Sequence, residues 1–513
     1  MKGQQLYWGD THTHLTDLDQ ASGIIENAKE NIDFSVILLY PFSYEIKNGF
    51  RIETTQNRPE YFEHWKKINE ISQRNNVPGS FTTFPGYEWN GNRTKYGDHN
   101  VIYLNEGNPL DDCWELSNLY TRLAARKAIA IPHHTGYLVG SRGKDWNFFD
   151  PNLSPVMELY SQHGSSEGVE TPGFMANNTS MGPGTDGGTY RNALTKGLRI
   201  GVIGSNDGPG LPGRWGMGRA AVWAVENTRV AIWESFSNHS TYAVTGDRIR
   251  LDFYIGETDM GGELSEREAI DINVDVVCSQ GLDKIELVRN GRIISKYAHV
   301  ARISDTSSFP NKFKLFLEVG WGPAKHNGFS LPEGGWTWDG SLHVEGGKIT
   351  SIERCFSLPG QSVVFDDPQD CHWSLKTAAR DTRSPMGLSQ GLILELMTNE
   401  NATIELSCEG KHVHLPVRTL LTGTKLIPLI DEIIEVVNRQ FGLSDKDVLN
   451  PDAYYQNARK MVLHRASPVW EYEVSHVFPS VPLEAGENSF YVIVSQTNGQ
   501  RAWSSPIWVN NSR

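Results

Sequence analysis

The chain has 513 residues, more than one hydrophobic core usually serves, so we expect two or three domains. It carries 47 Lys and Arg against 61 Asp and Glu, a formal net charge of −14. This charge argues against a nucleic-acid or anionic-membrane partner, because phosphate surfaces demand basic patches. An anionic small-molecule substrate is not excluded, since a bound metal ion reverses the local field.

Cysteine usage and hydropathy favour a cytoplasmic location. The five cysteines are widely spaced and include no C-x-x-C pair, so neither a disulfide scaffold nor a zinc ribbon is expected. No window reaches 18 apolar residues, and the first residues contain no apolar signal core. We therefore expect no membrane partner, while homo-oligomerisation stays open.

Up to about residue 250, short apolar runs alternate with segments of helical periodicity. The apolar runs predict buried strands at 6–8, 34–39, 128–131, 156–160 and 200–203. Amphipathic spacing between them predicts helices at 20–31, 59–75, 116–127 and 228–238. Such alternation indicates a parallel sheet or barrel, so we assign residues 1–250 to an α/β domain.

Beyond residue 250 the pattern changes to alternating or continuously apolar runs. Strands are predicted at 270–277, 284–288, 313–319 and 490–494, with Asn290-Gly291 as a hairpin turn. Residues 251–513 are therefore expected to form a mostly β domain with a helical insertion near 426–463. A carbohydrate-binding module, a lid and a dimer surface are all open roles for it.

The first strand leads into a pair of histidines. In the run Leu6-Tyr-Trp-Gly-Asp-Thr-His12-Thr-His14, extended backbone directs side chains two residues apart to the same side. His12 and His14 can therefore reach one ion.

Further metal-ligand residue types follow other strands. They are Glu88 after 80–85, His99 before 101–104, His133 and His134 after 128–131, and Asp207 after 200–203. In a parallel barrel these strand ends share one face, where active sites form. Converging imidazole and carboxylate groups suit Zn, Mn or Fe.

These motifs resemble the PHP (polymerase and histidinol phosphatase) superfamily, and in particular a large, mostly uncharacterised branch of it. The resemblance begins with Trp8-Gly-Asp-Thr-His12-Thr-His14 followed by Asp19. It continues through a series that spans nearly the whole chain: Pro85-Gly-Tyr-Glu88-Trp, Gly97-Asp-His99-Asn-Val, Ile131-Pro-His-His134, Tyr160-Ser-Gln-His163-Gly-Ser-Ser-Glu167, Gly201-Val-Ile-Gly-Ser and Ala502-Trp-Ser-Ser-Pro-Ile-Trp.

The resemblance implies a distorted (β/α)7 TIM-like barrel with up to three metals. By the family pattern, the first metal is held by His12, His14, Glu88 and Asp207. Glu88 then bridges to the second metal, which His99 and His134 also hold, with His133 as the alternative to His134.

Two family positions for the third metal are missing. Tyr40 stands where the family has a histidine after the second strand, and Pro209 stands where it has one after the last Asp. Asp19 is left without partners, so we expect two divalent ions (Zn, Mn or Fe) and no third.

A binuclear centre of this kind implies a metal-dependent hydrolase with a metal-bridging hydroxide and an anionic small-molecule substrate. Asp207 can act as general base, and His163 either assists the leaving group or is a structural histidine behind the ligands. Five residues are expected to contact substrate or to support the ligands: Asp19, Tyr40, His133, Glu167 and Arg191.

The bond that is cleaved is less well defined. Phosphoester hydrolysis is the family default and is our first expectation. Hydrolysis of an amide, ester or lactone is the alternative, because the missing third metal commonly helps to hold phosphate. A third hypothesis is a non-catalytic binding protein with the same fold. Measurement of the metal content would test it, because such a protein is expected to contain no metal.

Overall fold

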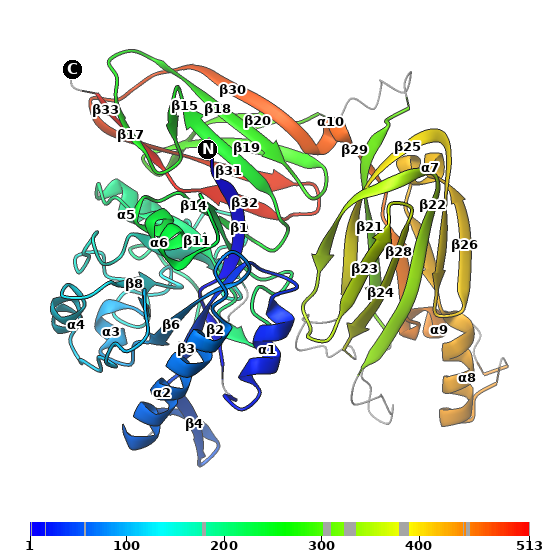
Figure 1. The fold of residues 1–513 in the computed structure, drawn as a ribbon, viewed down its shortest axis with the longest axis horizontal. Coiled ribbons are helices and arrows are strands. Elements are labelled where there is room, and N and C mark those ends of the chain that lie inside the picture. Colours follow the sequence, from blue (N-terminus) through cyan, green and yellow to red (C-terminus); the bar gives the residue numbers. More distant parts are fainter. Residues whose placement is uncertain are drawn as a thin grey trace. The chain divides into compact units, whose positions relative to one another are not determined.

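The computed structural model describes residues 1, 3–15, 17–55, 58–176, 181–300, 309–322, 335–378, 389–444, 446–447 and 452–511, in two compact units (Figure 1). Unit 1 comprises Met1–Val277, Leu282–His299 and Val474–Arg513, and unit 2 comprises Cys278–Gly281 and Val300–Glu473. The predicted boundary at residue 250 does not follow this division. The physical reason is strand pairing, because the last strands complete the sheet that the first strands begin.

The predicted elements of the first 250 residues are present in unit 1. The helices are α1 (Ala21–Ala28), α2 (Arg58–Asn75), α3 (Arg93–Tyr96), α4 (Leu116–Leu123), α5 (Tyr190–Thr195) and α6 (Arg229–Ser237). The strands are β1 (Gln5–Asp10), β2 (Thr13–His14), β3 (Phe34–Leu39), β4 (Phe42–Lys47), β5 (Phe50–Thr55), β6 (Thr82–Glu88), β7 (His99–Tyr103), β8 (Ala128–Pro132), β9 (Val156–Ser161), β10 (Gly164–Ser165), β11 (Gly201–Gly204), β12 (Gly208–Pro209), β13 (Arg219–Ala224) and β14 (Thr241–Val244).

A closed (β/α)7 barrel is not found among the described residues, and this corrects the predicted architecture. Strands β1, β3 and β6 are parallel, but β7 and β8 continue the sheet antiparallel, and β13 joins β1 antiparallel. Strands β9 to β11 form a separate three-stranded sheet. Apolar runs specify burial but not strand direction, so the sequence could not distinguish this mixed sheet from a barrel.

One apolar cluster nevertheless joins the two sheets. Val36, Ile102 and Ile131 from the large sheet pack in the same cluster as Val156 and Ile203 from the small one. The side chains at the ends of these strands are thereby held over a common core.

The remaining strands of unit 1 pair antiparallel except at one edge, where Glu263–Ser265 runs parallel to Ile507–Asn511. These strands are β15 (Arg250–Ile255), β16 (Thr258–Asp259), β17 (Glu263–Ser265), β18 (Ile270–Val277), β19 (Leu282–Arg289), β20 (Arg292–Ala298), β30 (Glu473–Val481), β31 (Gly486–Gln496), β32 (Arg501–Ser504) and β33 (Ile507–Asn511). Asn290 and Gly291 form the predicted hairpin turn, both with positive φ, as a two-residue turn requires. Strand β32 pairs with β14, which brings the red strands of Figure 1 into the N-terminal sheet.

In its described part, unit 2 is a nine-stranded antiparallel sheet with short helices. Its strands are β21 (Lys312–Gly320), β22 (Trp336–Cys355), β23 (Ser362–Asp367), β24 (Asp370–Thr377), β25 (Ser389–Cys408), β26 (Lys411–Pro416), β27 (Lys425–Pro428), β28 (Lys460–Leu463) and β29 (Ser467–Pro468). Its helices are α7 (Val417–Thr422), α8 (Ile430–Phe441), α9 (Asp452–Asn457) and α10 (Val469–Tyr472). Helices α8 and α9 lie within the predicted helical insertion 426–463, but its two ends belong to strands β27 and β28, and its residues 445 and 448–451 lie outside the described residues.

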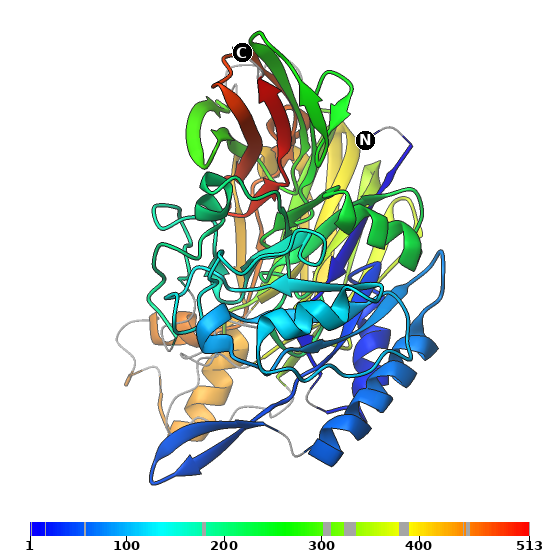
Figure 2. The same cartoon turned by 90° about the vertical axis from the view of Figure 1, so that its left-hand side faces the viewer.

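A two-stranded hairpin, β4–β5, extends from the end of β3 and is the blue ribbon that projects outward in Figure 2. Among the described residues, no helix is long and apolar enough to cross a membrane.

Candidate metal centre

Asp10, at the end of β1, forms hydrogen bonds with two loops, one carrying His12 and the other carrying Asn206. Its Oδ1 accepts hydrogen bonds from the backbone N–H of His12 (2.9 Å) and of Asn206 (3.2 Å). Its Oδ2 accepts from the Thr13 hydroxyl at 2.7 Å. The buried Asp10 carboxylate thus sets the His12 loop against the loop that carries Asp207.

Eight mostly buried side chains gather at these strand ends. They form four overlapping groups, and within each group the potential ligand atoms lie within 4.8 Å of one another. The groups are His12/His14/Asp207, His12/Glu88/His133, Asp98/His133/His134 and His134/His163/Asp207.

The four groups form a closed ring, because each shares one residue with the next. Only opposite groups use different residues, so at most two complete groups can be filled without sharing a ligand. One such pair is His12/His14/Asp207 with Asp98/His133/His134, which leaves Glu88 between His12 and His133.

His12 is oriented as a metal ligand would be. Its Nδ1 lies 2.8 Å from Glu158 Oε2, which also accepts a hydrogen bond from Ser205. Its Nε2 is therefore directed to the cluster, 3.4 Å from Asp207 Oδ1 and 3.2 Å from His14 Nε2. Metal-bound histidines generally donate their other ring N–H to such a carboxylate.

Charge in the cluster shifts pKa values strongly. Burial alone would lower the pKa of His12, but the carboxylates of Asp207 and Glu158 outweigh it and raise that pKa well above its usual value. Burial would raise the pKa of Glu88 and of Asp207, yet the neighbouring histidines hold both well below their usual range. The carboxylates are thus ionised, as metal ligands must be.

Several buried ligand atoms make no hydrogen bond with the described residues. These are Glu88 Oε2, His134 Nδ1 and both ring nitrogens of His133. A buried polar atom without a partner costs roughly 1–3 kcal/mol, so native proteins rarely keep several together without a purpose. A cation can take one ring nitrogen from each histidine together with a carboxylate oxygen, so this donor set fits divalent metal ions.

Two residues of the cluster have left-handed backbone. His134 has φ 32° and Asp207 has φ 53°. Such conformations are uncommon for residues other than glycine and cluster at functional sites.

Asp98 is held between two arginines. Its Oδ1 lies 3.0 Å from Arg93 Nη1 and its Oδ2 lies 2.6 Å from Arg142 Nε. Burial opposes ionisation, but these guanidinium groups hold the pKa of Asp98 well below its usual range. Arg93 also lies 3.6 Å from Glu88 Oε1, so cations border the ligand cluster.

His163 joins the cluster from the loop after β9. Its Nε2 lies 3.1 Å from Asp207 Oδ2, and its Nδ1 lies 2.8 Å from the Tyr137 hydroxyl. This position is compatible both with metal ligation and with the predicted role beside the leaving group.

His99, a predicted ligand of the second metal, takes part in none of the four groups found among the described residues. Its Nε2 lies 3.1 Å from Lys144 Nζ, and its Nδ1 lies 3.1 Å from the Gly97 carbonyl. Burial lowers the pKa of Lys144 to about 7. The side chains grouped with His134 are instead Asp98 and His133 on one side and His163 and Asp207 on the other.

The remaining predicted residues lie apart from the ligand groups or beside them. Asp19 is exposed and lies 3.5 Å from Lys67 Nζ. The Tyr40 ring stacks on His14 with centroids 4.0 Å apart. Glu167 accepts hydrogen bonds from Arg191 Nε (2.8 Å) and from the Tyr491 hydroxyl.

Sequence reasoning missed Asp98 and Glu158 as members of the site. A signal existed for both. Asp98 directly precedes a candidate histidine, and Glu158 is a carboxylate within the otherwise apolar run of β9. Arg142, Lys144 and Tyr137 belong to no periodic pattern or motif that would have identified them.

The chain matches the family model described as "Protein of unknown function (DUF3604)" over residues 27–136 and 178–283. The matched ranges contain Glu88, Asp98, His133, His134 and Asp207. The other three cluster residues lie outside them: His12, His14 and His163.

Among curated proteins, the chain is similar to uncharacterised chlamydial proteins. It is 28% identical to one from Chlamydia pneumoniae, over 45% of this chain and 40% of that protein. It is 26% identical to one from Chlamydia trachomatis, over 57% of this chain and 49% of that protein. The chain thus spans half or less of the length of the relatives it matches.

Among solved structures, the chain is similar to a two-domain protein containing a predicted PHP-like metal-dependent phosphoesterase from Bacteroides vulgatus. The sequence identity is 14% and the TM-score 0.33, over 58% of this chain and 86% of that chain.

Proposed function

We propose that unit 1 is a metal-dependent hydrolase with two divalent ions at the ring of ligand groups. The observation that carries the proposal is the set of buried, unpartnered ligand atoms on Glu88, His133 and His134, together with the outward support of His12 by Glu158. The motif resemblance to the PHP superfamily supports the same reaction class.

In this proposal His12, His14 and Asp207 hold one ion, and Asp98, His133 and His134 hold the other. Glu88 lies between them, since its Oε2 is 3.8 Å from His12 Nε2 and its Oε1 is 3.7 Å from His133 Nε2. Ions bound there would supply a hydroxide near neutral pH and polarise the scissile bond.

The chain's own residues would do the rest. Asp207 Oδ2 and His163 Nε2 form a close acid–base pair that can hold a proton and return it to the leaving group. Tyr137 fixes the His163 ring from the far side. Arg93 and Arg142 add positive charge at the edge of the cluster, which favours an anionic substrate.

A phosphoester is the proposed substrate class because it combines an anionic group with the need for a charged, water-activating centre. Cleavage of a carboxylic ester, lactone or amide is the alternative that a substrate screen must distinguish.

Elemental analysis of protein purified without chelators tests the proposal. We expect about two transition-metal ions per chain, with hydrolysis of phosphoesters that a chelator abolishes and added Zn or Mn restores. His14→Ala should lose metal, whereas Asp19→Asn, which changes an exposed carboxylate outside the groups, should not. Protein that binds no metal on addition of Zn or Mn would contradict the hydrolase proposal.

The same measurement addresses the predicted absence of a third ion. Three ions per chain, one of them lost in Asp19→Asn, would show that Asp19 has partners that the motif comparison did not identify.

A further inference from the structure

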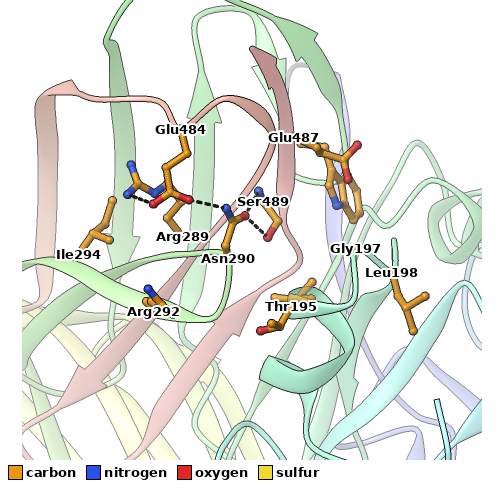
Figure 3. A pocket seen from close by; sticks show the side chains of 12 residues that line it. Thr195, Gly197, Leu198, Arg289, Asn290, Arg292, Ile294, Glu484, Glu487 and Ser489 are labelled. Carbon is orange, nitrogen blue, oxygen red and sulfur yellow. Dashed lines mark hydrogen bonds and ion pairs between the residues drawn. The ribbon is translucent and has the colours of Figure 1, made fainter. Parts of the chain in front are cut away.

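Unit 1 contains a cavity of about 420 Å3 that is built from residues outside the four ligand groups (Figure 3). It lies between the end of α5, the β19–β20 hairpin and the strands β31 and β33. Its volume is within the range of small-molecule sites, which is roughly 300–1,000 Å3. A small ligand therefore fits without rearrangement of the sheet.

One wall is a fixed polar network. Arg289 Nη2 lies 2.5 Å from Glu484 Oε1, and Asn290 Nδ2 donates to Glu484 Oε2 at 3.2 Å. Asn290 Oδ1 in turn accepts from the backbone N–H of Ser489 at 2.8 Å. The dashed contacts in Figure 3 trace this network. It orients the Glu484 carboxylate, whose side chain is still 54% exposed and retains free lone pairs.

The opposite wall presents a second oriented carboxylate. Glu487 Oε2 accepts from Arg199 Nε at 3.0 Å, and Arg199 is itself tied to Glu263. The Glu487 side chain is 35% exposed, so it too can accept further hydrogen bonds. The cavity thus offers two acceptors that call for donor groups on a ligand.

Arg292 is the one lining cation without a charged partner. Arg289 is neutralised by Glu484 and Glu487 by Arg199, whereas the Arg292 guanidinium makes no hydrogen bond or ion pair with the described residues. It stands apart from the dashed network in Figure 3. The four charged lining residues sum to zero, and the Arg292 guanidinium is the charged group among them that has no ion-pair partner in the described part of the chain.

Apolar side chains complete the lining. Leu194, Leu198 and Ile294 face the same cavity and give a ligand a surface for its carbon skeleton. A purely polar ion would leave this surface in contact with water.

We propose that this cavity binds a hydroxylated organic monoanion of the sugar-acid class. Its carboxylate would pair with Arg292, its hydroxyl groups would donate to Glu484 and Glu487, and its ring face would cover the apolar side chains. A phosphate dianion fits less well, because the two lining carboxylates repel a second negative charge. A simple fatty carboxylate lacks the donors that these carboxylates need.

Calorimetric titration of the full-length protein with D-glucuronate tests the proposal. We expect saturable binding to the wild type and a loss of affinity of roughly tenfold or more in Arg292→Gln, because hydrogen bonds between charged groups are among the stronger ones. Glu484→Gln should also weaken binding. Arg267→Gln, which removes an exposed arginine elsewhere in unit 1, is the matched control and should bind as the wild type does.

Glucose and glucuronamide, which lack the anionic group, should bind at least tenfold more weakly than glucuronate. Absence of saturable binding at millimolar glucuronate would overturn the proposal, as would equal affinity of Arg292→Gln and wild type. Equal affinity for glucuronate and glucuronamide would overturn the assignment of an anion. Thermal melting of each variant shows that it is folded, and metal content stays an independent readout of the other site.

Discussion

Buried glutamate and histidine side chains differ between the two units in whether their polar atoms have partners. In unit 2, the buried Glu318 lies 2.8 Å from His464 Nε2, and the buried Glu471 is paired with Arg465. In unit 1, Glu88 and His133 are as deeply buried, yet their ligand atoms are left without hydrogen-bond partners among the described residues.

This difference distinguishes side chains that stabilise the fold from side chains that are available to bind a ligand. Each carboxylate named in unit 2 forms an ion pair with a neighbouring side chain and is not positioned to coordinate a metal ion. Unpartnered atoms in unit 1 lower the stability of the metal-free fold by roughly 1–3 kcal/mol each. Among the described residues, the buried carboxylate and imidazole atoms without a hydrogen-bond partner lie in unit 1, and for this reason we place the proposed chemistry there.

The strongest test of this contrast is to change one buried glutamate in each unit. Glu88→Gln should lose more than roughly 100-fold in metal affinity and abolish hydrolysis, because a neutral amide replaces the carboxylate between the two ion positions. Glu318→Gln in unit 2 should keep its metal. Elemental analysis and circular dichroism measure both, and full metal occupancy in Glu88→Gln would refute its role.

A substitution in the apolar core of unit 2 should reduce stability without affecting metal binding. Trp338 is fully buried in that core, and Trp338→Ala should destabilise unit 2 by about 3–5 kcal/mol through the cavity it leaves. Denaturant unfolding measures the loss, and metal content should not change. Loss of metal in this variant would show that the integrity of unit 2 is required by the metal centre.

A smaller effect should follow from the residue that orients His12. Glu158→Gln keeps the shape of the side chain but weakens the support of His12 Nδ1, so metal affinity should fall by roughly 10–100-fold. Competition with a chelating dye gives the affinity. Glu167→Gln, another buried glutamate of unit 1, is the control and should retain wild-type affinity, since Glu167 contacts Arg191 and Tyr491 instead.

The last prediction concerns Lys144 and the pH dependence of stability, and its effect is small within any one pH unit. Burial lowers its folded-state pKa to about 7, below the ~10.4 of an unfolded chain. Between these values the unfolded chain binds more protons, so stability falls as pH decreases, by at most roughly 1.4 kcal/mol per pH unit. Lys144→Met should flatten this dependence between about pH 7 and pH 10. Melting temperatures across that window measure it, and an unchanged slope would contradict the assignment.

The sequence predicted local structure better than assembly. The helices near 59–75 and 228–238 and the strands near 34–39 and 128–131 are present because their apolar periodicity is a local property. The antiparallel pairing of β7 and β8 depends on contacts between separate segments, and an apolar run does not indicate the direction in which its strand will pair.

The same limit applies to the site. His12 and His14 could be grouped from their two-residue spacing, and the structure brings them within 3.2 Å of each other. His99 instead contacts Lys144, which lies 45 residues further along the chain and follows no motif. A spacing argument therefore identifies adjacent ligands more readily than those brought together from separate loops.

The return of the C-terminal strands to unit 1 has a consequence for synthesis. Strand β32 supplies the neighbour of β14, although more than 250 residues separate them along the chain. During translation the edge of β14 stays uncovered while all of unit 2 emerges from the ribosome, and exposed edges are prone to pair with other chains. Nearly all of unit 2 comes from one continuous stretch of the chain, Val300–Glu473. It can therefore fold before the last strands of unit 1 have been synthesised. Nascent chains stalled before residue 474 should accordingly depend on chaperones more than the released protein does.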